Sequence, residues 1–75
     1  MAADIAIQND NDAVAERVFK DMAEFNWNRG NFEQAEISYW HEIRCLLSLY
    51  GFYNKKTIAC LNNIAQARTK RDAVY

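Results

Sequence analysis

The 75-residue chain contains no proline, only two glycines, two cysteines and a single histidine. Without proline, the breaks between helices depend on glycine and asparagine. There is no glycine-rich phosphate loop, and one histidine with two cysteines does not make a zinc site. No apolar run approaches the roughly 20 residues that a membrane-spanning helix needs. We therefore expect no metal, no cofactor and no membrane segment.

The two cysteines, Cys45 and Cys60, lie fifteen residues apart, which matches neither a redox pair nor a disulfide framework. Both stand among apolar residues, so we expect free, reduced thiols and an intracellular, cytoplasmic protein. The first residues show no basic segment followed by an apolar core, so nothing in them indicates export.

His41 and Cys45 are the one pair of residues that resembles catalytic machinery. They lie four residues apart and therefore share a helical face, as a base and a nucleophile would. That face lies opposite the expected apolar stripe of the helix, and the sequence indicates no third group or oxyanion donor. Two ligands also do not make a metal site. We predict that the protein is not an enzyme.

Charge is unevenly distributed, although the net charge is only −1. Residues 1–42 contain nine acidic and three basic residues, whereas residues 43–75 contain six basic residues and one acidic residue. A solvated surface explains such asymmetry, but a dipolar chain can also steer an oppositely charged partner. Nucleic-acid binding is the weaker alternative, because no recognition motif accompanies the bases. The bases that it would use are Lys55, Lys56, Arg68, Lys70 and Arg71.

Apolar periodicity predicts a first helix over residues 13–28, with an N-cap at Asn11 or Asp12. Residues 1–12 are predicted to form a flexible tail, unless the two isoleucines in that segment dock elsewhere. The apolar side chains that share one half of the helical wheel are Val14, Val18, Phe19, Met22, Ala23 and Phe25.

A second helix is predicted over residues 32–50 and a third over residues 55–71. The first two helices each end at a glycine, and Asn31 and Asn54 can cap the helices that follow. The apolar stripe of the second helix consists of Phe32, Ala35, Tyr39, Ile43, Leu46 and Tyr50, widened by Trp40 and Leu47. The stripe of the third helix consists of Thr57, Ile58, Leu61, Ile64 and Ala65.

These elements predict an all-α protein, in which an antiparallel helical hairpin and a third helix form one domain over residues 13–75. A chain of this length buries only about 60% of its unfolded surface. Because its apolar fraction is 51%, we expect some apolar side chains either to fill the small core or to contact another protein.

The pattern of the first helix returns 42 residues later, as in stacked helical repeats whose units bury their apolar faces against neighbours. The second unit contains only its first helix, so we expect an uncovered face where a further helix would pack. The matching positions are Ala15 with Thr57, Val18 with Cys60, Phe19 with Leu61, Met22 with Ile64, Ala23 with Ala65, Arg29 with Arg71 and Phe32 with Val74.

Four short blocks are similar to the tetratricopeptide repeat, in its 42-residue kinesin-light-chain variety. They are Gly30-Asn31-Phe32-Glu33-Gln34-Ala35 with Tyr39, Ile43-Arg44, Tyr50-Gly51 and Leu61-Asn62-Asn63-Ile64-Ala65. The resemblance covers about one and a half repeats. It implies an αα superhelix fragment, and a module that binds a partner protein or peptide.

In that family, peptides lie along a concave groove lined by the first helix of each repeat. By position, the resemblance implies a groove lined by Arg17, Lys20, Glu24, Trp27, Asn62, Gln66 and Lys70. Asn62 and Asn63 are of most interest, because an amide can satisfy a peptide donor and acceptor together. Alternatively, one of them braces a neighbouring loop. The family's carboxylate clamp has asparagine four residues after a lysine, but Glu24 follows Lys20, so peptides with acidic C-termini should bind poorly.

Ile37 lies outside the stripe of the second helix, so it is a candidate for contact with another protein. Trp40 is a candidate interface anchor or a filler of space within the hairpin. Self-association through the uncovered end of the stack is a further expectation. The alternative to a binding module is a small structural subunit whose exposed faces are permanently buried in a larger intracellular assembly.

Overall fold

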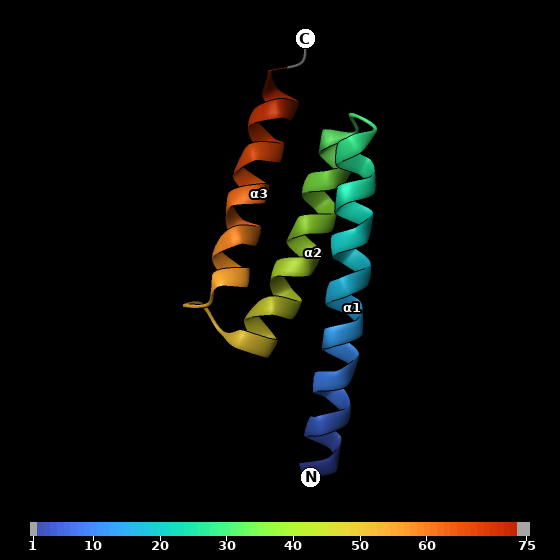
Figure 1. The fold of residues 1–75 in the computed structure, drawn as a ribbon, viewed down its shortest axis with the longest axis vertical. Coiled ribbons are helices and arrows are strands. Elements are labelled where there is room, and N and C mark those ends of the chain that lie inside the picture. Colours follow the sequence, from blue (N-terminus) through green and yellow to red (C-terminus); the bar gives the residue numbers. More distant parts are fainter. Residues whose placement is uncertain (1, 74–75) are drawn as a thin grey trace.

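The structure, a computed structural model, describes the backbone of residues 2–73 and the side chains of residues 11–73. Within this range there is no strand, and the chain forms three α-helices: α1 (Ala2–Asn28), α2 (Phe32–Tyr50) and α3 (Lys55–Asp72). Consecutive helices run antiparallel, and α2 packs against both α1 and α3 (Figure 1). The predicted all-α fold, with a hairpin and a third helix, is confirmed.

Helix α1 begins at Ala2, eleven residues before the predicted start. Neither proline nor glycine occurs before Asp12, and asparagine or aspartate within a helix costs less than about 1 kcal/mol relative to alanine. The N-terminal turns therefore continue the helix beyond the α2–α3 connection (Figure 1). The predicted N-cap at Asp12 is wrong, because this residue lies inside α1. Its Oδ2 instead accepts a hydrogen bond of 2.7 Å from Ser48 Oγ.

The flexibility of residues 1–12 stays a prediction. The docking of Ile5 and Ile7, and the match of Val74 to Phe32, lie outside the side chains that the structure describes.

The ends of the helices follow the predicted turn chemistry. Gly30 and Gly51 have positive φ angles of 80° and 82°, a region that side chains with a Cβ rarely adopt. Asn54 caps α3, because its side chain accepts a hydrogen bond of 2.9 Å from the backbone N–H of Lys56. Asn31 also stands at an N-cap position, but its side chain makes no capping bond.

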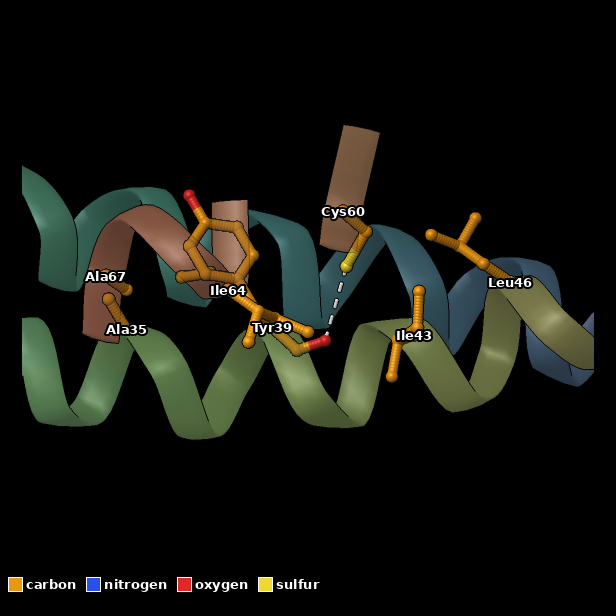
Figure 2. Close-up of a cluster of buried hydrophobic side chains, with 8 residues drawn as sticks. Ala35, Tyr39, Ile43, Leu46, Cys60, Ile64 and Ala67 are labelled. Carbon is orange, nitrogen blue, oxygen red and sulfur yellow. Dashed lines mark hydrogen bonds between the residues drawn. The ribbon is translucent and has the colours of Figure 1, made fainter. Parts of the chain in front are cut away.

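The core forms where α2 meets its two neighbours (Figure 2). Half of the core cluster comes from the predicted α2 stripe. Alanines with no exposed surface stand on all three helices, and their small side chains let the backbones approach closely. The cluster consists of Ala23, Ala35, Tyr39, Ile43, Leu46, Cys60, Ile64 and Ala67.

The predicted stripes of α1 and α3 are wrong in part, because α2 covers only one side of each helix. In α1 only Ala23 is buried and Phe19 is half-buried, whereas the other four members are exposed: Val14, Val18, Met22 and Phe25. In α3, Ile58 and Ala65 are exposed, and the unpredicted members of the core are Cys60 and Ala67. On α2, Trp40, Leu47 and Tyr50 are also exposed.

Candidate peptide-binding groove

A groove runs between α1 and α3, with α2 as its floor. It consists of two adjoining hollows of about 520 Å³ and about 350 Å³, and Glu24 and Asn63 line both. The wall from α1 consists of Glu16, Arg17, Lys20, Asp21, Glu24, Trp27 and Asn28. The wall from α3 consists of Lys56, Ala59, Cys60, Asn63 and Gln66, and the floor from α2 of Tyr39 and Glu42. We call this set the α1–α3 groove.

The α1–α3 groove brings together five of the predicted binding residues, because their helical spacing puts them on the facing sides of the two helices. They are Lys20, Glu24, Trp27, Asn63 and Gln66. Arg17 lines the same groove. Two residues that were predicted to line the groove lie elsewhere: Asn62 is exposed outside both hollows, and Lys70 borders a separate hollow of about 400 Å³ on α3.

Asn63 is half-buried in the groove wall. Among the described side chains, neither Asn62 nor Asn63 makes a hydrogen bond, so nothing supports a role in bracing a loop. The Asn63 amide therefore faces the groove with its donor and acceptor available to a ligand. Trp27 is half-buried beside it and packs edge-on against Phe32, with ring centroids 5.1 Å apart.

Two unpredicted residues, Glu42 and Cys60, form the bottom of the groove. The Cys60 thiol donates weak hydrogen bonds to the Tyr39 carbonyl at 3.3 Å and to Glu42 Oε1 at 3.5 Å; Figure 2 shows the first of them. Burial raises the pKa of the Cys60 thiol, so it stays protonated. The sequence did carry a signal for Glu42, since it lies seven residues after Ala35 and four before Leu46, on the buried side of α2.

Glu42 is only 5% exposed, and burial raises the pKa of its carboxyl group to about 7. A hydrogen bond with the Glu16 carboxyl group raises this pKa further, while the Cys60 hydrogen bond and the charge of Lys20 lower it. Near neutral pH the Glu42 carboxyl group at the floor of the groove is therefore only partly ionised.

The rim of the groove carries both signs of charge. Acidic side chains from α1 stand beside Arg17 and Lys20, and Lys56 faces them from α3. Such a surface suits a ligand with mixed charges rather than a polyanion. Within residues 11–73, no group of three or more histidine, cysteine or acidic side chains is placed to hold a metal ion.

The sequence placed His41 and Cys45 together on a face of the second helix opposite its apolar stripe, and this prediction is wrong for Cys45. Cys45 is buried, because α1 packs on that side of α2, and burial raises the pKa of its thiol. His41 is exposed at the edge of the same interface, where its ring stacks on Phe19 with centroids 5.0 Å apart. Both cysteines carry free thiols in this structure.

Ile37 and Trp40 lie on α2, away from the residues that line the groove, and both are exposed. The Trp40 indole N–H donates a hydrogen bond of 3.1 Å to Glu36 Oε2. Glu36 Oε1 accepts a second hydrogen bond, of 2.8 Å, from Arg71 Nη1. Trp40 is therefore held at the surface of the protein by its polar end.

The basic residues considered for nucleic-acid binding are spread along α3, from its first turn to its last. Arg71 pairs with Glu36 near the C-terminal end of α3, whereas Lys56 lies over the Tyr50 ring at the other end of that helix. Lys70 stands beside Arg71 in the last turn of α3 and borders the hollow formed with Ala65, Gln66 and Thr69. In addition, no helix within residues 2–73 has the length and apolar content to cross a membrane.

Comparison with known proteins found no match among family models, curated protein sequences or solved structures. The resemblance to tetratricopeptide repeats therefore rests on the four sequence blocks and stays a prediction.

Proposed function

We propose that the protein is a protein–protein interaction module that binds an extended segment of a partner protein in the α1–α3 groove. The observation that carries this proposal is the meeting of Lys20, Glu24 and Trp27 with Asn63 and Gln66 across one groove. These residues come from helices that are separated in sequence by the whole of α2. Grooves between helices that bear a few convergent polar groups are common ligand sites.

The groove offers a different contact to each part of a peptide. The Asn63 and Gln66 amides can pair with peptide backbone groups of any sequence. Lys20 and Glu24 can pair with charged side chains of either sign, and Trp27 offers a rigid apolar surface. Because Glu24 borders both hollows and Glu42 lies at the floor, a peptide whose C-terminal end is acidic should bind poorly.

The tetratricopeptide resemblance supports the same proposal. Gly30 ends α1 with a positive φ angle, and Ala35 is fully buried at the start of α2. In that family these positions hold the turn glycine and the small residue that lets the paired helices approach. We propose on this basis that α1 and α2 correspond to one repeat and α3 to the first helix of the next.

Selection from a displayed peptide library, followed by fluorescence anisotropy, tests the proposal. Truncating one central contact, as in Asn63→Ala or Trp27→Ala, should weaken binding of the selected peptides by about five- to thirtyfold. Ile37→Ala is the matched control, because Ile37 is exposed but does not line the groove. If Ile37→Ala weakens binding while the two groove substitutions do not, the proposed site is wrong.

A structural subunit within a larger assembly is the second candidate, and exposed apolar side chains such as Val14, Phe25, Trp40 and Phe52 favour it. Analytical ultracentrifugation of the isolated chain separates the two candidates. A folded monomer or dimer favours the binding module, whereas an aggregated or molten chain favours the obligate subunit.

A further inference from the structure

The outer side of α1 carries an apolar stripe that no part of the described structure covers. Val18, Met22 and Phe25 follow one another at helical spacing and are 49%, 46% and 58% exposed. On the helical wheel they point away from Lys20 and Glu24, which line the α1–α3 groove. The stripe is therefore a second surface, separate from the groove.

The same positions 42 residues later show how such a stripe is buried. Cys60, Ile64 and Ala67 on α3 are only 2%, 5% and 0% exposed, because α2 packs on them (Figure 2). Helix α2 precedes α3 in the chain and runs antiparallel to it (Figure 1). By analogy, the outer side of α1 has the form of a surface that receives an antiparallel helix.

The two helices also carry an arginine at equivalent positions, Arg29 in α1 and Arg71 in α3. Arg71 fixes α3 to α2, since its Nη1 donates a hydrogen bond of 2.8 Å to Glu36 Oε1. Arg29 lies 42 residues before Arg71 and is exposed, with its guanidinium group 5.3 Å from the centre of the Phe25 ring. Among residues 11–73, Arg29 has no ion-pair partner. A helix packed on α1 as α2 packs on α3 would bring a carboxylate to this arginine.

We propose that the outer stripe of α1, which consists of Val18, Met22, Phe25 and Arg29, binds an amphipathic α-helix of a partner protein. The partner helix runs antiparallel to α1. It presents an apolar side, and near its N-terminal end it carries an acidic residue that pairs with Arg29. Because Phe25 is larger than its counterpart Ala67, the partner helix lies further from α1 than α2 lies from α3.

A second copy of this chain is a poor occupant of the stripe. The helix with the required features is α2, and in each copy its acidic Glu36 is already paired with that copy's own Arg71. Another copy could offer this face only if its α3 moved away from α2, which would expose Ile64 and Cys60. A helix from a different protein meets no such cost.

A fluorescent peptide with the sequence of residues 31–51 is a suitable probe, because it reproduces α2. We expect saturable binding to the full chain, measured by fluorescence anisotropy. Met22→Asp should weaken binding at least tenfold, and Arg29→Gln should weaken it about three- to tenfold. Arg17→Gln is the matched control, because Arg17 is an exposed arginine of α1 that lines the groove instead.

A charge exchange tests the ion pair directly. Arg29→Glu should weaken binding of the probe, and a probe that carries Glu36→Arg should restore it. Circular dichroism of each variant confirms that the chain is folded. Asn63→Ala should leave binding of the probe unchanged, so that failure of this proposal is distinguishable from failure of the groove.

Three results would overturn the proposal. The first is the absence of saturable binding to the folded chain. The second is binding that neither Met22→Asp nor Arg29→Gln weakens. The third is a dimer of the chain that the Met22→Asp substitution disrupts but that added probe does not dissociate. The outer stripe would then be occupied by a second copy of the chain.

Discussion

Ala23 in α1 and Ala65 in α3 occupy the same place in a pattern that recurs after 42 residues, yet only Ala23 is buried. The reverse holds for the neighbouring large side chains, because Met22 is exposed while its counterpart Ile64 is buried. Helix α2 follows α1 and precedes α3, so it meets a different side of each helix. The two helices therefore use opposite halves of the same apolar pattern.

This difference shows that each copy of the pattern carries apolar side chains on two sides of its helix, and that α2 covers a different side in each copy. A fully buried aliphatic side chain contributes about 1.5–3 kcal/mol, but only where a neighbour removes water from it. In α1 the side that is equivalent to the buried side of α3 is open, and in α3 the side that is equivalent to the buried side of α1 is open. Equivalent substitutions in α1 and α3 should therefore have unequal effects.

The largest expected effect comes from Ile64→Ala, which should lower the free energy of unfolding by about 3 kcal/mol because it leaves a cavity in the core. Met22→Ala, at the equivalent position, should lower it by less than about 1 kcal/mol, because Met22 is half exposed. Urea unfolding followed by circular dichroism measures both. Equal losses would mean that the outer stripe of α1 is covered in solution.

Replacing Ala23 and Ala65, which occupy equivalent positions, with leucine should destabilise the protein more in α1 than in α3. Ala23→Leu should destabilise the fold by about 1–3 kcal/mol, since Ala23 has no exposed surface and the helices meet there. Ala65→Leu should change stability by less than about 0.5 kcal/mol, because Ala65 faces solvent. Thermal unfolding of the two variants distinguishes them. The comparison fails if Ala65→Leu is the more damaging change.

Glu42 on α2 lies beside the Glu16 carboxyl group of α1 and the Cys60 thiol of α3. Its contribution to the free energy of unfolding depends on pH. Its pKa rises from 4.5 in the unfolded chain to about 7 in the folded protein, so the folded state holds the proton more tightly. The free energy of unfolding should therefore fall as pH rises from about 4.5 to about 7. Glu42→Gln should remove most of this fall and stabilise the protein above pH 7 by about 1–3 kcal/mol. Urea unfolding over this pH range tests the effect, and an unchanged slope would contradict it.

The smallest expected effect concerns the two arginines. Arg71→Gln should lower the free energy of unfolding by about 1 kcal/mol or less, because the guanidinium group that pairs with Glu36 is partly exposed. Arg29→Gln should lower it by about 0.5 kcal/mol or less, since Arg29 has no ion-pair partner among residues 11–73 and its guanidinium group lies over the exposed Phe25 ring. Chemical unfolding at low and high salt provides the measurement. A salt-sensitive loss with Arg29→Gln would reveal a partner for that side chain.

Much of the local structure was predictable because it depends on residues close together in the chain. The positive φ angles at Gly30 and Gly51 and the Asn54 cap follow from turn chemistry. The buried face of α2 followed from its periodicity, with Ala35, Tyr39, Ile43 and Leu46 all in the core. The start of α1 was missed, because no proline or glycine ends the helix before Asp12, and the Asp12 side chain bonds to Ser48 of α2 instead of capping a helix.

The groove was predictable only in part. The family resemblance indicated Lys20, Glu24 and Trp27, and the structure places them opposite Asn63 and Gln66. It did not indicate Glu42 and Cys60, whose importance depends on burial between helices rather than on a motif. It also assigned Asn62 to the groove, where the rotation of α3 on α2 presents Asn63 instead.

The sequence by itself determined that the chain is all-α, where most of its helices end and which side of α2 is apolar, because glycine, asparagine and helical periodicity act over one or two turns. Only the tertiary structure decided which side of α1 and of α3 is buried. Each of these helices has more apolar surface than α2 can cover, so the side that α2 covers became the core. The side left open on α1 became the outer stripe, and the space between α1 and α3 became the groove.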